Sequence, residues 1–267
     1  MPKIHSLACV NPNAQLASDV EIGPFCVIGP HVSIDSGCKL YNNVTILGHT
    51  TIGKNNVFYP NAVIGTPPQD LKYRGGPTRV QIGDNNQIRE AVTIQCGTET
   101  GSGVTIVGSN NLLMVNCHIG HDAHFGDKCI IGNNVMIAGH VRCHDGVAMM
   151  GGVGIHHFVT VGEYAYIAGY ARIHHDVPPY VKVDGADRVR ALNALGLKRH
   201  GFSDEDIEQL ERATRRLFFG REKPFSTVLA EFDTMNGLNP CVKRLIDFIH
   251  QRNQGKHGRY QEALRSR

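Results

Sequence analysis

Large apolar residues recur at every sixth position along most of this chain. One run extends from Ile4 to Ile64 and returns in the same phase at Ile82, and a second run, shifted by one residue, extends from Val107 to Ile173. An α-helix repeats about every 3.6 residues, so it cannot keep such a column on one face, whereas a short strand followed by a corner can. Three such units would close a triangular coil, and stacked coils would pair as parallel strands about 4.8 Å apart. The repeat therefore predicts a parallel β-helix.

Two further positions of each unit support this interpretation. The fourth residue after each large apolar residue is small and apolar, and this column includes Cys26, Cys38, Cys117 and Cys129. These cysteines are thus expected to be small core residues. The third residue is often one that tolerates the left-handed backbone conformation, as a tight corner requires. The corner residues expected on this ground are Asn13, Asp19, Gly37, Asn43, Asn55, Asn61, Asn85, Asn110 and Asn134.

The repeat is interrupted twice and then ends. Residues 66–79 and 95–104 break the period and are expected to leave the prism as loops, where functional residues commonly lie. Beyond the repeat, Ser203 begins an N-capping pattern that is followed by helical apolar stripes. The predicted organisation is a β-helix domain over residues 1–186 and an α-helical domain over residues 187–267 that covers the open end of the last coil.

Composition excludes several classes of protein. A net charge of only +3 gives no reason to expect nucleic acid binding. No apolar run approaches the length of a membrane span, and the N-terminal residues lack the apolar core of a signal peptide. The eight cysteines have no CxxC spacing, which is typical of reduced thiols. Together these features predict a cytoplasmic protein.

The segment NCHIGHDAHFG, residues 116–126, contains three evenly spaced histidines. The six-residue phase separates them: His118 precedes an inward residue on one face, His121 lies near a corner, and His124 belongs to the next face. They are therefore not expected to bind one metal ion within a single chain. Zinc needs three or four ligands, so a zinc site here would require histidines from another subunit.

A coil of eighteen residues places further histidines at the same corner. Gly139 should lie directly above His121, and a vertical row of histidines should follow. A histidine with a pKa near neutrality can act as a general base. Asp122 could orient His121 only if the corner bends the backbone, because neighbours in a strand point to opposite sides. For any single histidine, an ordinary surface position is the more frequent explanation. The expected row comprises His121, His140, His156, His157, His174 and His175.

Seven motifs together resemble the UDP-N-acetylglucosamine O-acyltransferase family over essentially the whole chain. QDLKY, HIGHD and GLKRHG are more specific than the repeat, which many acyltransferases share. The motifs are NCHIGHD (116–122), QDLKY (69–73), PTRV (77–80), SNNLLM (109–114), AGHV (138–141), DVPPYV (176–181) and GLKRHGFS (196–203).

The resemblance implies a left-handed parallel β-helix, a homotrimer, and active sites between neighbouring subunits. It also implies transfer of an (R)-3-hydroxyacyl group from acyl carrier protein to the glucosamine 3-hydroxyl of UDP-N-acetylglucosamine, the first step of lipid A biosynthesis. No metal and no cofactor is implied, apart from the 4'-phosphopantetheine on the carrier protein. No protein nucleophile is needed, because the sugar hydroxyl can attack the thioester directly once a base takes its proton.

The family's functional positions fall on particular residues of this sequence. The general base falls on His121, its partner on Asp122, and the backbone N–H that stabilises the oxyanion on Gly139. Gly169 matches the position that sets acyl-chain length, and a glycine there leaves room for a longer chain. The positions that bind substrate are Asp70, Lys72, His118, His140, His156, Asn193 and Arg199.

Four positions depart from the family pattern, and basic residues follow the repeat. His200 replaces an arginine, His157 stands where glutamine is frequent, and Gln95 and Cys96 replace a His-Arg pair found in some members. The basic side chains of the C-terminal region suit an acidic carrier protein. They are Lys198, Arg199, Arg212, Arg215, Arg216, Arg221 and Lys223.

Three other interpretations remain open. The later N-acyltransferase of the same pathway normally has an extra N-terminal domain, whereas the repeat here begins at Ile4. A γ-class carbonic anhydrase is also a trimeric β-helix, but it would require stoichiometric zinc. A solenoid that only binds a partner would leave Asp70, Lys72 and His121 without a shared purpose.

Overall fold

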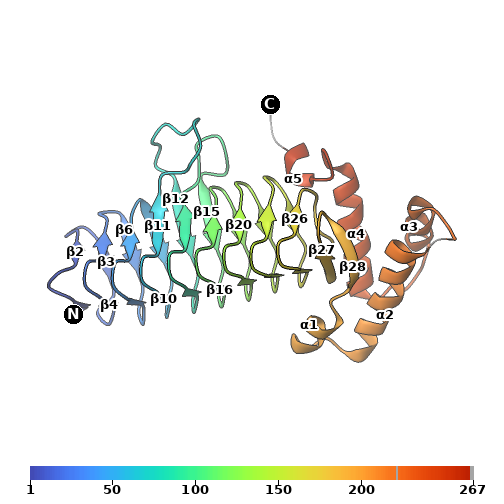
Figure 1. Cartoon of the computed structure of the whole chain (residues 1–267), viewed down its shortest axis with the longest axis horizontal. Helices are drawn as coiled ribbons and strands as arrows, with labels where there is room; N and C mark the ends of the chain where they lie inside the picture. The colour runs from blue at the N-terminus through green and yellow to red at the C-terminus, as the bar shows by residue number, and fades with distance from the viewer. Residues whose placement is uncertain (221, 265–267) are drawn as a thin grey trace.

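The computed structural model describes residues 1–220 and 222–264 and consists of a long prism of short strands followed by helices (Figure 1). Three sheets form the faces of the prism, and consecutive strands pass from the first to the second to the third sheet in turn. Every pairing within the prism is parallel, and Ile22, for example, pairs with Leu40, eighteen residues later. The β-helix predicted from the repeat is therefore the observed architecture.

The strands are short, and their bounds are as follows. The first sheet contains β1 (Lys3–Ile4), β4 (Glu21–Ile22), β7 (Lys39–Leu40), β10 (Val57–Phe58), β13 (Gln87–Ile88), β16 (Leu112–Leu113), β19 (Ile130–Ile131), β22 (Ala148–Met149), β25 (Tyr166–Ile167), β27 (Val181–Asp184) and β28 (Arg188–Leu192). The second contains β2 (Cys9–Val10), β5 (Val27–Ile28), β8 (Thr45–Ile46), β11 (Val63–Thr66), β14 (Thr93–Gln95), β17 (His118–Ile119), β20 (Met136–Ile137), β23 (Gly154–Ile155) and β26 (Arg172–Ile173). The third contains β3 (Gln15–Leu16), β6 (Val32–Ile34), β9 (His49–Ile52), β12 (Arg79–Ile82), β15 (Val104–Val107), β18 (His124–Phe125), β21 (Arg142–Cys143) and β24 (Thr160–Val161).

The apolar columns fill the interior of the prism. Residues of both columns, such as Ile119 and Val135, have no exposed surface, and they form one continuous cluster from Val20 to Val183. Six of the eight cysteines are buried, among them Cys117 and Cys129, and burial raises the pKa of both thiols to about 12. These two cysteines are therefore small core residues, as the sequence predicts.

The corners use the left-handed conformation at most of the expected positions. Gly37, Asn43, Asn55, Asn61, Asn85, Asn110 and Asn134 all have positive φ. The expectation was wrong for Asn13 and Asp19, which lie in the first coils and do not have positive φ. The corner at Asn13 has a local side-chain hydrogen bond instead, from the N–H of Asn13 to the side chain of Asn11. The Asp19 carboxylate accepts the N–H of Gly37 in the next coil.

A ladder of buried asparagines runs along the edge between the third and first sheets. Asn86 donates its side-chain N–H to the Asn56 side-chain oxygen at 2.9 Å and accepts the N–H of Asn111 at 2.8 Å. The Asn111 oxygen in turn accepts the N–H of Cys129. Each coil is thereby joined to the next by hydrogen bonds within the core, where an unpaired amide would be costly.

Two loops leave the prism between its second and third sheets, at the top of Figure 1. The first connects β11, which ends at Thr66, to β12, which begins at Arg79, and the second connects β14, ending at Gln95, to β15, beginning at Val104. Gln95 joins them, since its side-chain oxygen accepts the N–H of Gln69. Glu99 of the second loop also joins the two loops, because its carboxylate accepts the backbone N–H of Gly76 in the first loop.

The last coil leads into a hairpin and then helices. Strands β27 and β28 are antiparallel, so this hairpin straddles the expected domain boundary at residue 186. The helices are α1 (Ala194–Arg199), α2 (Asp204–Thr214), the π-helix η1 (Arg215–Phe219), α3 (Phe225–Asp233), α4 (Pro240–Gln254) and α5 (Tyr260–Ala263).

The helices pack on one another and against the end of the prism (Figure 1). Ser203 caps α2, as its side chain accepts the N–H of Asp206. Leu210, Leu217 and Leu245 lie in a second apolar cluster that is separate from the core of the prism. Within residues 1–220 and 222–264, no helix is long and apolar enough to cross a membrane.

Candidate active site

The edge between the second and third sheets, here called the histidine edge, carries the predicted histidine row at its corners. His121 and Asp122 form the corner between β17 and β18. Asp122 has a φ of 58°, a left-handed conformation that aspartate tolerates better than most residues. This corner turns its carboxylate toward His121, and the Oδ2 atom lies 2.9 Å from His121 Nδ1. The corner therefore bends the backbone in the way that Asp122 needs in order to orient His121.

The second loop encloses the Asp122 carboxylate. Thr98 donates its hydroxyl to Oδ2 at 2.6 Å and its backbone N–H at 3.1 Å. Oδ1 accepts the Ser102 hydroxyl at 3.1 Å and the Gly103 N–H at 3.0 Å. Burial alone raises the pKa of this carboxyl, but the hydrogen bonds from His121 and Thr98 outweigh it and bring the pKa to about 2. Asp122 is therefore ionised at neutral pH.

An ionised Asp122 determines the tautomer of neutral His121. Because the carboxylate can only accept a hydrogen bond, His121 Nδ1 must carry the proton. The lone pair of the neutral ring is then on Nε2, which makes no hydrogen bond to any residue that the structure describes. His121 is nearly buried, with 8% of its surface exposed, and retains a small opening at this edge. The ring thus offers a free, oriented proton acceptor.

Gly139 lies directly above the His121 ring, as the eighteen-residue coil predicts. A Cβ atom at this position would lie 2.5 Å from His121 Cε1 and 2.6 Å from Nε2, so only glycine fits. Gly139 is buried, and its N–H donates no hydrogen bond within the described part of the chain. A free backbone donor therefore lies beside the free nitrogen of the histidine.

His140 and His118 approach the pair from two sides. The His140 ring meets the His121 ring edge-on with centroids 5.0 Å apart, and its Nδ1 lies 4.0 Å from Asp122 Oδ2. His118 projects from β17 onto the outer face of the second sheet, where its Nδ1 lies 2.7 Å from the Thr93 hydroxyl. Burial, with a smaller contribution from His121, lowers the pKa of His118.

His124 and the upper part of the row complete the edge. His124 lies in β18 of the third sheet, separate from His118 in the second, as the phase predicts. His156 is exposed one coil above His140, and its Nδ1 lies 3.1 Å from the backbone oxygen of His157. Burial lowers the pKa of His157, although Asp70 opposes this shift from the first loop.

Asp70 and Lys72 lie in the first loop, on the same edge as His121. The Asp70 carboxylate accepts the backbone N–H of Lys72 at 2.9 Å, and the Lys72 side chain is exposed. The loop is thus tightly turned around the half-buried Asp70 and presents the Lys72 side chain outward.

Three other predicted residues lie on other edges of the prism. Gly169 is at the corner between the first and second sheets, against Met150 and Gly151. Asn193 is buried near the corner between the third and first sheets, where its side chain donates to the backbone oxygen of Tyr164. Arg199 is exposed at the end of α1, beyond Asn193. A single chain therefore does not bring these residues to His121.

Two hollows flank the His121 pair. One, of about 250 Å³, lies toward the third sheet and is lined by Asp122, His140 and Phe158 together with Leu264 from the C-terminal end. The other, of about 340 Å³, lies on the outer face of the second sheet between His118 and His156. The residues beside His121 thus line a hollow on each side of this edge.

His121, Asp122 and His140 also place possible metal-ligand atoms within 4.8 Å of one another. The Asp122 oxygens, however, already accept hydrogen bonds from the second loop and from His121. A cation would have to displace these donors, so the donor set fits an acid–base pair better than a zinc site.

The sequence did not indicate the residues that enclose Asp122. Thr98 and Ser102 were part of an expected loop without a role of their own. Gly101 also helps to enclose Asp122, because a Cβ atom at this position would lie 2.4 Å from the Asp122 carboxyl group. The only indication in the sequence was the high glycine content of residues 95–104, which suits a loop that packs closely against other groups. Gln95, a departure from the family pattern, serves here to join the two loops.

Comparison with known proteins identifies relatives along the whole chain. Residues 176–257 match the family described as "Udp N-acetylglucosamine O-acyltransferase; Domain 2", and residues 31–66 match the bacterial transferase hexapeptide repeats. The acyl-[acyl-carrier-protein]–UDP-N-acetylglucosamine O-acyltransferase of Herminiimonas arsenicoxydans is 42% identical over 96% of this chain and 99% of its own length. The chain belongs to the UDP-N-acetylglucosamine O-acyltransferase family.

Other members of the UDP-N-acetylglucosamine O-acyltransferase family agree in sequence and in fold. The relative of the same name from Thermodesulfovibrio yellowstonii is 40% identical, with the same coverage. The UDP-N-acetylglucosamine acyltransferase structure from Bacteroides fragilis has a TM-score of 0.87 at 40% identity and covers 92% of this chain and 96% of its own. The predicted fold class, a left-handed parallel β-helix followed by a small helical region, is confirmed. These relatives do not favour the carbonic anhydrase interpretation.

Proposed function

We propose that this chain transfers an (R)-3-hydroxyacyl group from acyl carrier protein to the glucosamine 3-hydroxyl of UDP-N-acetylglucosamine, with His121 as the general base. The observation that carries this proposal is the free Nε2 of His121, held by Asp122 beneath the free N–H of Gly139. A base and an oxyanion donor side by side are what attack of a hydroxyl on a thioester requires.

The reaction follows from these positions. His121 Nε2 takes the proton of the 3-hydroxyl as the sugar oxygen attacks the thioester carbonyl carbon. The carbonyl oxygen becomes negative, and the Gly139 N–H donates a hydrogen bond to it. When the carbon–sulfur bond breaks, the imidazolium returns its proton to the leaving thiolate of the carrier's 4'-phosphopantetheine. Asp122 stays ionised throughout and stabilises the imidazolium.

The active form is proposed to be a homotrimer with sites between subunits. Gly169, Asn193 and Arg199 lie on edges of the prism different from that of His121. They reach the reacting groups only if another subunit places its own edge against the histidine edge. In that arrangement Asn193 and Arg199 lie near the donor and its phosphate, and Gly169 limits the length of the acyl chain.

The first loop and the helices complete the proposed binding sites. Asp70 and Lys72 contact the sugar nucleotide from the histidine edge, where His118, His140 and His156 line the cleft. The basic side chains of the helices attract the acidic carrier protein. Arg221, one of the basic residues named from the sequence, lies outside the described residues, as do residues 265–267. The enzyme is proposed to act in the cytoplasm without a metal or a bound cofactor.

The proposal is tested with UDP-N-acetylglucosamine and a series of 3-hydroxyacyl carrier proteins. His121→Ala is expected to lower acyl transfer at least about 10²-fold, since general base catalysis contributes about that much. His31→Ala is the matched control, because His31 stacks on His49 lower on the same edge and should leave transfer unchanged. Near-normal turnover by His121→Ala would show that His121 is not the base.

Metal analysis separates the proposal from the zinc alternative. The purified enzyme is expected to contain no stoichiometric zinc and to keep its activity after treatment with a chelator. Stoichiometric zinc, together with activity that a chelator abolishes and zinc restores, would instead support a metal site at His121, Asp122 and His140.

A further inference from the structure

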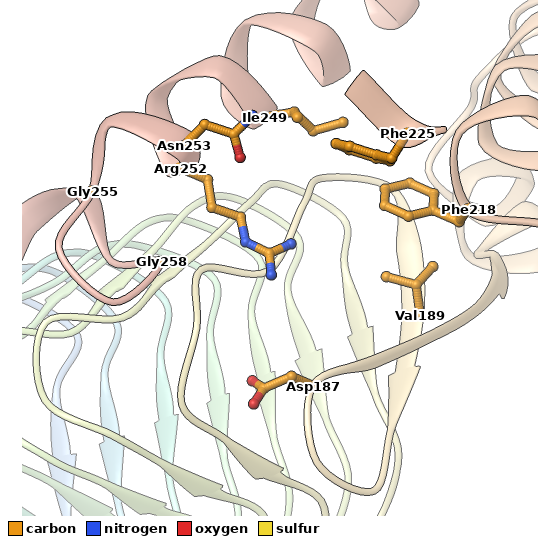
Figure 2. Close-up of a pocket in the computed structure, with 9 residues that line it drawn as sticks. All are labelled: Asp187, Val189, Phe218, Phe225, Ile249, Arg252, Asn253, Gly255 and Gly258. Carbon is orange, nitrogen blue, oxygen red and sulfur yellow. The ribbon is translucent and has the colours of Figure 1, made fainter. Parts of the chain in front are cut away.

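A cavity of about 550 Å³ lies between the end of the prism and the C-terminal helices (Figure 2). It adjoins His174 and His175 at the end of the histidine edge, and neither His121 nor Asp122 lines it. Its roof is α4 with Ile249 and Arg252, its floor is the β27–β28 hairpin with Asp187 and Val189, and aromatic rings close one side. This volume lies within the range of small-molecule sites, roughly 300–1,000 Å³. Neither the family resemblance nor the proposed reaction uses this cavity.

A half-buried cation, Arg252, lines the cavity without a hydrogen-bonded counterion among the described residues. Figure 2 shows the Arg252 side chain extending from α4 into the space above Asp187. Its guanidinium makes no hydrogen bond and no ion pair with any residue in the described part of the chain. Burial lowers the pKa of Arg252, and Asp176 and Asp187 only partly oppose this effect. A guanidinium remains charged in proteins, so this site holds a half-buried, partly desolvated positive charge.

The two nearest carboxylates are engaged elsewhere. Asp187 accepts the backbone N–H groups of His174 and His175 at 2.8 and 3.0 Å, and His175 Nδ1 lies 2.9 Å from its Oδ2. Asp176 accepts the N–H groups of Thr160 and Tyr260, both at 2.7 Å. Neither carboxylate forms a hydrogen bond or an ion pair with the half-buried Arg252. The donors of Arg252 are therefore available to a ligand.

The rest of the cavity is largely apolar on one side. Phe218 and Phe225 lie together with ring centroids 6.0 Å apart, and Ile249 and Val189 lie above and below them. A ligand held by Arg252 would thus have a hydrocarbon surface beside its charged group. Burial of methylene groups there would contribute to binding, at about 0.8 kcal/mol for each group fully buried.

We propose that this cavity binds a small organic monoanion, a carboxylate on an alkyl chain, with its head on Arg252 and its chain against Phe218 and Phe225. A carboxylate matches the guanidinium fork with two parallel hydrogen bonds. A single negative charge suits the site better than a phosphate dianion, because Asp187 and Asp176 already place negative charge near Arg252. The site is separate from the proposed acyl-transfer site and does not depend on that reaction.

The test uses decanoic acid carrying a diazirine in its alkyl chain, photolysed with the full-length enzyme and mapped by mass spectrometry. We expect saturable labelling of peptides that contain Phe218, Phe225 or Ile249. Excess octanoate should block it, whereas octan-1-ol, which has the same chain without the charge, should block it at least about tenfold less effectively. His121→Ala should be labelled like the wild type, which separates this site from acyl transfer.

Two variants and a matched control test the assigned contacts. Arg252→Gln should lower labelling at least about tenfold, whereas Lys243→Gln, which changes an exposed cation on the same helix, should not change it. If thermal unfolding shows that Arg252→Gln does not fold, Phe225→Glu is decisive, because Phe225 is 39% exposed and Arg252 is retained. That variant should also lose labelling, since a carboxylate then faces the ligand's chain.

The proposal is overturned by any of three results. The first is a wild-type enzyme that is labelled only at the histidine edge, or that is not labelled at all. The second is equal competition by octanoate and octan-1-ol. The third is undiminished labelling of a folded Arg252→Gln or Phe225→Glu variant.

Discussion

Replacing Thr98 with valine removes one hydroxyl from the enclosure of Asp122 and changes the shape of the side chain very little. Thr98 has no exposed surface, and its hydroxyl donates to Asp122 Oδ2 at 2.6 Å. Asp122 is 4% exposed, so water does not readily replace the lost donor. A hydrogen bond to a charged group contributes about 1.5–3 kcal/mol, and each pKa unit corresponds to about 1.36 kcal/mol. Thr98→Val should therefore raise the pKa of Asp122 by roughly one to two units.

The pH dependence gives the sign of the effect. A carboxyl whose pKa is lowered to about 2 contributes stability that is fully present above about pH 4 and lost as the pH falls toward 2. Thr98→Val should lower the free energy of unfolding by about 2 kcal/mol at pH 7. The difference from the wild type should narrow as the pH falls below about 4, because the variant has less of this contribution to lose.

Denaturant unfolding between pH 7 and pH 3, together with acyl-transfer kinetics, measures both consequences. We expect kcat to fall by about tenfold with little change in KM, because His121 loses its orientation rather than its substrate. Thr98→Ser, which restores the hydroxyl, should recover most of the stability and activity. A Thr98→Val enzyme that is as stable and active as Thr98→Ser, or a stability difference that does not depend on pH, would refute the role assigned to this hydroxyl.

Three other substitutions give separate tests. Gly139→Ala should lower kcat at least about tenfold without loss of folding, because its Cβ would displace the His121 ring; normal kinetics would contradict the geometry. Burial raises the pKa of Asp176 to about 6, above the ordinary value near 4. The free energy of unfolding should therefore fall by about 2–3 kcal/mol as the pH rises from about 4 to 6. Asp176→Asn should remove this pH dependence in denaturant unfolding measured across that range. Asn86→Ala should lower the free energy of unfolding by at least about 2 kcal/mol, since it removes the partners of the Gly108 carbonyl oxygen and the Asn111 N–H; a smaller loss in denaturant titration would show that water replaces the amide.

Much of the architecture follows from the sequence because its information is local and repeated. A strict six-residue period permits strands and corners but no helix, and an eighteen-residue coil places Gly139 above His121 without any knowledge of other contacts. The same phase separates His118 from His124. The two interruptions were also evident, because a loop that leaves a solenoid must break its period.

The chemistry of the site required the tertiary structure. Thr98 lies twenty-four residues before Asp122, and no periodicity shows that a loop between coils will close over that carboxylate. Asp122 occupies the third position after Ile119, where the repeat places left-handed corners, but the repeat does not show that this corner turns the carboxylate toward His121.

The distribution of the proposed site over three edges likewise came from the structure. The sequence by itself determined the stack of coils, since a strict six-residue period of apolar residues fits short strands and corners and not an α-helix. Only the tertiary structure decided which side chains Asp122 meets and that Asn193 and Gly169 lie away from His121. Those contacts join residues far apart in the chain, and their geometry depends on how the loops and helices pack on the prism.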